Sequence, residues 1–101
     1  MRNIARDALL NELRALRPRL ERRGVVHIAL FGSRARRDNR PDSDVDLIVD
    51  IDERLPFSLI DLVGVTHEVE DRLGLPANLF VRRSLEPGFA AEAAREQVPV
   101  F

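Results

Sequence analysis

Three short runs of aliphatic residues constrain the fold of this chain more than any other feature of its sequence. The runs 25–31, 45–51 and 75–81 have the length and the β-branched, aliphatic composition of buried strands. A stretch with helical spacing separates the second run from the third, so this crossover is long enough for a parallel or mixed sheet. About a dozen residues join the first run to the second, which is too many for a tight hairpin. We therefore expect that connection to contain functional residues.

Helical spacing surrounds the three runs. Leu9, Leu13, Leu16 and Leu20 repeat at intervals of four, three and four, which predicts one apolar helix face with a break near Pro18. A second helix is predicted up to residue 73, with Ser58 and Asp61 as its capping pair, and a third over 86–96 before an apolar tail at 98–101. The pattern predicts an α/β (α+β) fold in which helices flank a small mixed sheet.

Length and composition narrow the class of protein. A chain of 101 residues fits one domain, 1–101, without room for a second lobe. The net charge of −1 predicts no direct nucleic-acid binding, although an arginine cluster at 34, 36, 37 and 40 suits a phosphate-sized ligand. Without cysteine, disulfides and zinc thiolates are excluded. Since no stretch is apolar enough for a membrane span or a signal peptide, we expect a cytoplasmic protein. A homo-oligomer and an obligate partner both remain open.

The junction Gly32-Ser33 ends the first strand just before a predicted helical turn. Gly32 permits close approach of the backbone, Ser33 offers a hydroxyl, and the following N–H groups can point at an anion. A plain turn capped by Ser33 is the alternative, and for Gly-Ser alone it is the more common one.

The pair Asp44 and Asp46 stands at the start of the second strand. Side chains two residues apart in a strand share a face and lie about 6–7 Å apart, so the two carboxylates can converge on one Mg²⁺ ion. A solvated strand entrance is the alternative. The glycine turn and the aspartate pair on successive strands indicate nucleotide binding more specifically than either does alone. A metal on the carboxylates would bridge nucleotide phosphates held at the glycine turn.

The segments GSRARR and SDVDL resemble the patterns G-S-x-A-R-G and S-D-x-D-L of the minimal nucleotidyltransferase (MNT) domains of the DNA polymerase β-like superfamily. The resemblance covers nearly the whole chain and implies the polymerase β-like nucleotidyltransferase fold. It implies that Gly32 and Ser33 bind the triphosphate of ATP and that Asp44 and Asp46 bind Mg²⁺, with Mn²⁺ as an alternative. Beside these residues, we expect Arg34 and Arg36 to contact the nucleotide phosphates.

Two positions depart from the family pattern. Arg37 replaces its second glycine, and Asn78 stands where active members usually carry a third catalytic carboxylate. An amide is a very poor base at pH 7, and loss of a positioned base costs about 10²–10⁴ in rate.

The resemblance implies an antitoxin that transfers AMP from ATP to a HEPN-domain toxin. Asn78 keeps a second possibility open. In that case the chain is a catalytically impaired nucleotide-binding or protein-binding antitoxin that neutralises its partner by contact.

Overall fold

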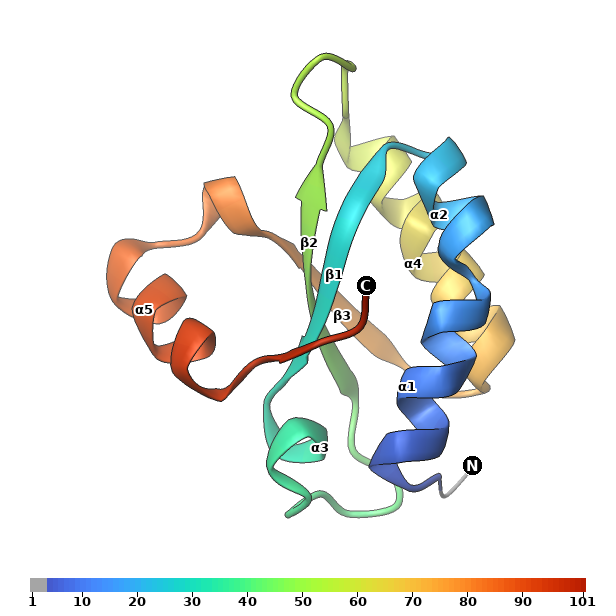
Figure 1. Cartoon of the computed structure of the whole chain (residues 1–101), viewed down its shortest axis with the longest axis vertical. Coiled ribbons are helices and arrows are strands. Elements are labelled where there is room, and N and C mark those ends of the chain that lie inside the picture. The colour runs from blue at the N-terminus through green and yellow to red at the C-terminus, as the bar shows by residue number, and fades with distance from the viewer. Residues whose placement is uncertain (1–3) are drawn as a thin grey trace.

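A four-stranded mixed sheet forms the centre of the protein, in the order β3-β2-β1-β4 (Figure 1). The computed structural model describes residues 4–101. Strand β1 pairs antiparallel with β2, and β2 pairs parallel with β3, so the predicted mixed sheet is confirmed. The strands are β1 Val25–Phe31, β2 Val45–Ile51, β3 Ala77–Val81 and β4 Val98–Pro99.

Two details of the sheet differ from the prediction. Strand β3 begins at Ala77 rather than at residue 75, and Pro76, which has no N–H to donate, offers only its carbonyl, which accepts the Val45 N–H at 2.9 Å. The apolar tail also contains a strand, since β4 pairs with β1 at the sheet edge through Ala29↔Pro99 and Leu30↔Val98.

The helices cover the sheet unequally. The first two, α1 and α2, lie with α4 on one face, and α5 lies on the other (Figure 1). Their bounds are α1 Arg6–Ala15, α2 Arg17–Arg22, α3 Ser33–Arg36, α4 Leu59–Leu73 and α5 Pro87–Glu96, with a 3₁₀ turn, η1, at Arg82–Ser84. Within residues 4–101 no helix combines the length and the apolarity that crossing a membrane requires.

The predicted helix ends are confirmed. Helix α1 ends at Ala15 and α2 begins at Arg17 with Pro18 in its first turn, so the break lies where the missing proline N–H places it. At the start of α4, Ser58 and Asp61 form a reciprocal capping box. Its C-cap is Gly74, at a positive φ of 67°.

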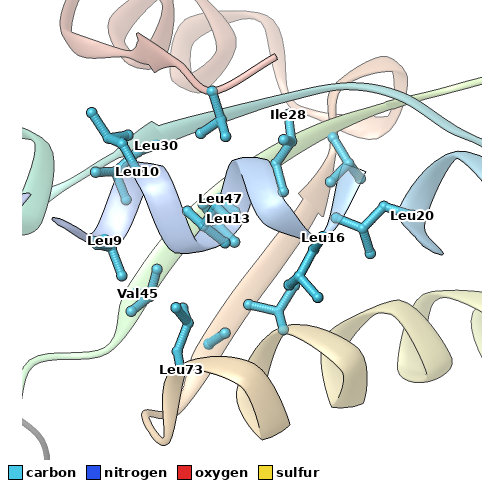
Figure 2. Packing of buried hydrophobic residues seen from close by; sticks show 14 of the residues in the cluster. Leu9, Leu10, Leu13, Leu16, Leu20, Ile28, Leu30, Val45, Leu47 and Leu73 are labelled. Carbon is cyan, nitrogen blue, oxygen red and sulfur yellow. The ribbon is translucent and has the colours of Figure 1, made fainter. Parts of the chain in front are cut away.

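The main core lies between the sheet and the helices of the first face. Leucines of α1, α2 and the junction between them form one cluster with residues of β1, β2 and α4, and Figure 2 shows Leu13, Leu16 and Leu47 in this cluster. Burial of one such side chain is worth about 1.5–3 kcal/mol. A smaller cluster of Phe31, Ile48 and Ala93 packs under α5. Because residues alternate along β2, Asp46 shares the α5 face with Ile48. The candidate carboxylates therefore lie on the less covered face.

Candidate active site

The two candidate carboxylates meet at one point. Asp44 directly precedes β2 and Asp46 lies within it, opposite Asn78 of β3. The Asn78 Nδ2 donates to Asp44 Oδ2 and to Asp46 Oδ1, at 3.1 Å each. One amide nitrogen thus contacts both carboxylates, so the structure brings Asp44 and Asp46 together around Asn78.

Gly32 connects the glycine turn to this pair. Its φ of +77° lies in the region that favours glycine, and a Cβ added to it would come within 2.5 Å of Asp46 Oδ2. No larger residue fits without moving the carboxylate. The turn and the carboxylates are thus parts of one site rather than two separate features.

The residues after Gly32 supply hydrogen-bond donors. Among residues 4–101, neither the backbone N–H groups of Ser33 and Arg34 nor the Ser33 hydroxyl has a hydrogen-bond partner. Helix α3 has only four residues, so its dipole adds little and the individual N–H groups matter most. This is the arrangement of an anion-binding turn.

Arg34 does not occupy the position expected of a phosphate ligand. Its side chain is buried, at 2% exposure, and its guanidinium donates to the carbonyls of Pro41, Ser43 and Ile4. Burial lowers the pKa of Arg34, and the nearby charge of Asp44 partly offsets this effect. In this structure the Arg34 side chain therefore holds the loop before β2 and places a positive charge near Asp44, rather than reaching out to a ligand.

Arg36 is, with Arg37, an exposed arginine of the motif. Its guanidinium pairs with Asp38 and with Glu96, each at 3.0 Å, and these hydrogen bonds raise its pKa. With 48% of its side chain exposed, Arg36 can exchange these partners for a ligand. The structure leaves it available to a phosphate, as Arg34 is not.

Glu96, at the end of α5, is the residue that the sequence did not indicate. Its Oε1 accepts the Gly32 N–H at 3.0 Å, and its Oε2 pairs with Arg36. A carboxylate at a helix C-terminus is unfavourable because it lies at the negative end of the helix dipole. This unfavourable placement is the sequence signal that Glu96 is held there by other contacts.

The backbone conformation of Arg37 accounts for the glycine that the family pattern has at this position. It is the C-cap that follows α3, with a φ of +65°, and it alone among non-glycine residues in 4–101 has a positive φ. Glycine adopts this conformation without steric cost, whereas arginine is strained there by about 1–2 kcal/mol. The substitution keeps the turn at a cost in stability.

The donor set fits a hard divalent cation. Asp44 and Asp46 offer carboxylate oxygens directed at one point, and Asn78 can add its amide oxygen if the side chain turns over. In the part of the chain that the structure describes, no three His, Cys, Asp or Glu residues are grouped for metal binding. A bound Mg²⁺ would therefore have two carboxylate ligands and complete its shell with water and phosphate oxygens.

Comparison with known proteins agrees with this geometry. Residues 11–100 match the sequence family described as the nucleotidyltransferase domain. A protein adenylyltransferase, MntA, from Thermococcus cleftensis is 41% identical over 80 residues, which is 79% of each chain.

Two solved structures share the fold. A minimal nucleotidyltransferase superposes with a TM-score of 0.81 at 30% identity, over 95% of this chain and 96% of the other. The Shewanella oneidensis complex of a tri-AMPylated HEPN toxin with its MNT antitoxin contains a chain similar in fold, with a TM-score of 0.69 at 16% identity, over 95% of this chain and 71% of that one. The chain therefore belongs to the nucleotidyltransferase domain family, as one of its minimal members with a polymerase β-like fold.

Proposed function

We propose that this chain transfers AMP from Mg²⁺-bound ATP to a side chain of a partner protein, and that the partner is a HEPN-domain toxin. The observation that carries the proposal is the convergence of Asp44 and Asp46 beside Gly32. The similar protein from Thermococcus cleftensis is a protein adenylyltransferase, and one chain of similar fold is an MNT antitoxin in complex with a HEPN toxin.

Each part of the site has a role in this reaction. Gly32, Ser33 and Arg36 hold the triphosphate, while Asp44 and Asp46 hold Mg²⁺, which offsets phosphate charge when bound. The acceptor hydroxyl oxygen forms a bond to the α-phosphorus as the bond to pyrophosphate breaks, and the hydroxyl proton is released. Since Asn78 cannot take that proton, we expect a rate about 10²–10⁴ below that of a site with a positioned base.

The exposure of the site favours a macromolecular acceptor. The side chains of Asp44 and Asn78 are exposed, and Asp46 is only half-buried. Small-molecule acceptors are usually enclosed in concave pockets of several hundred Å³. An exposed site at the start of β2 instead lets a protein segment bring its hydroxyl to the nucleotide.

Asn78 favours a second candidate function, neutralisation of the partner by contact alone. Its amide already satisfies both carboxylates without a metal, at 3.1 Å from each. In that case nucleotide binding is a vestige or a regulatory feature, and inhibition of the toxin requires no chemistry.

Labelled ATP, incubated with this chain and its HEPN-domain partner in Mg²⁺ or Mn²⁺, tests the proposal. We expect slow labelling of the partner, a large gain with Asn78→Asp, and no labelling with Asp44→Ala combined with Asp46→Ala. If the unmodified chain transfers no label to the partner, the transferase proposal is overturned. If the double variant still neutralises the toxin, contact is responsible.

A further inference from the structure

Glu96 binds the same donors that the proposed triphosphate site uses. Its two carboxylate oxygens accept from the Gly32 N–H and from Arg36 Nη1, each at 3.0 Å. A backbone N–H after a strand, together with a guanidinium, is an arrangement that recognises phosphate oxygens. The carboxylate of the chain itself therefore stands in for an anionic ligand.

Helix α5 does not need the Glu96 carboxylate at its C-terminus. It is the last residue of α5, where the helix dipole disfavours a negative charge. The end of α5 is held independently of it, because Arg82 Nη1 donates to Gln97 Oε1 at 3.0 Å and β4 pairs with β1. Glu96 can therefore leave Gly32 by rotation of its side chain alone.

The side chain has room for this rotation. It is 28% exposed, and its partner Arg36 is 48% exposed. Both can turn toward solvent without opening the core. The contact is thus stable enough to occupy the donors and accessible enough to be displaced.

We propose that Glu96 is an internal competitor of the nucleotide, whose carboxylate must leave Gly32 and Arg36 before the triphosphate binds. This inference rests on the proposed function, since it assigns an occupant to the same phosphate site. When Glu96 occupies these donors, the apparent affinity for the nucleotide equals the intrinsic affinity multiplied by the fraction of molecules in which the donors are free. The nucleotide affinity is therefore set partly by a residue that does not contact the metal.

Calorimetric titration of ATP and of inorganic tripolyphosphate into Glu96→Gln tests the proposal. The substitution keeps the shape of the side chain and removes its charge. We expect both ligands to bind about ten-fold more tightly than to the unmodified chain, because a charge-assisted pair no longer competes. The matched control is Glu92→Gln, which removes an exposed charge one helical turn away and should change either affinity less than about two-fold.

A shorter carboxylate provides a second test. Glu96→Asp keeps the charge but withdraws it from Gly32 by one methylene, so we expect binding tighter than in the unmodified chain and weaker than in Glu96→Gln. Equal binding by all three proteins would overturn the competition, and weaker binding by Glu96→Gln would mean that Glu96 holds the site in place. If ATP binds neither the unmodified chain nor Glu96→Gln, the proposed function fails with it, whereas equal binding to both removes only the role of Glu96.

Discussion

The substitution Asn78→Asp tests how the carboxylate pair is stabilised. It replaces the amide hydrogens 3.1 Å from Asp44 Oδ2 and from Asp46 Oδ1 with a third carboxylate oxygen. Two hydrogen bonds to charged acceptors are lost, and two repulsive contacts replace them. The fold itself loses no apolar contact, because Asn78 is exposed.

The magnitude follows from the two distances. At 3.1 Å, like charges repel by about 1 kcal/mol in bulk water and about 5 kcal/mol at an effective dielectric constant near 20. Asn78 and Asp44 are exposed, so solvent screening and side-chain rotation keep the cost toward the lower figure. We expect a net loss of about 1–3 kcal/mol in the free energy of unfolding at pH 7 without metal.

Urea unfolding in EDTA and in excess Mg²⁺ measures this effect. Mg²⁺ should restore most of the lost stability, since a ligand that binds only the native state stabilises it by an amount that rises with the logarithm of its concentration over its Kd. The control is Asn11→Asp, in which the exposed side chain keeps its role as acceptor from Arg14 Nη1, and we expect a change within about 0.5 kcal/mol with no dependence on Mg²⁺.

Two results would refute this reasoning. If Asn78→Asp is as stable as the unmodified chain in EDTA, the amide does not bridge the two carboxylates. If Mg²⁺ stabilises the variant no more than the unmodified chain, the three oxygens do not form a cation site.

Three further predictions concern single positions. Gly32→Ala should cost about 2 kcal/mol or more in urea unfolding and weaken ATP binding, because its Cβ would meet Asp46 Oδ2 at 2.5 Å. Gly74→Ala, at a similar φ of +67° with nothing within 4 Å, should cost only about 1 kcal/mol, and equal losses would refute the contact. Arg37→Gly should raise the free energy of unfolding by about 0.5–1 kcal/mol because its φ is +65°, whereas Arg37→Ala should not. The N–H groups of residues 88 and 89 lower the pKa of Glu86 below 4.5, so its contribution should be present above pH 4.5 and lost as the pH falls further, and an unchanged acid limb in Glu86→Gln would contradict this.

The local parts of the site followed from the sequence. Spacing by two residues places Asp44 and Asp46 on one face of any strand, and the strand-to-turn junction at Gly32 is readable from composition. The bridge by Asn78 required the parallel register of β2 and β3, in which Asp46 lies opposite Asn78. Spacing within one strand carries no information about that register.

The two remaining differences arise from contacts that helical and strand periodicity does not reveal. Arg34 was expected to bind the nucleotide, but its buried side chain donates to the carbonyls of Ile4, Pro41 and Ser43. Glu96 reaches Gly32 across 64 residues because the two-residue strand β4 returns beside β1. So short a strand, with proline in it, leaves no periodic pattern in the sequence.

The most direct test of the metal-nucleotide site is calorimetric titration of ATP with Mg²⁺ into the unmodified chain and into Asp44→Ala combined with Asp46→Ala. We predict saturable binding of one nucleotide per chain that depends on Mg²⁺, and a loss of about ten-fold or more in the double variant. The control is Asp42→Ala, an exposed carboxylate of the preceding loop, which should bind as the unmodified chain does. Undiminished, Mg²⁺-dependent binding by the double variant would contradict the assignment of Asp44 and Asp46.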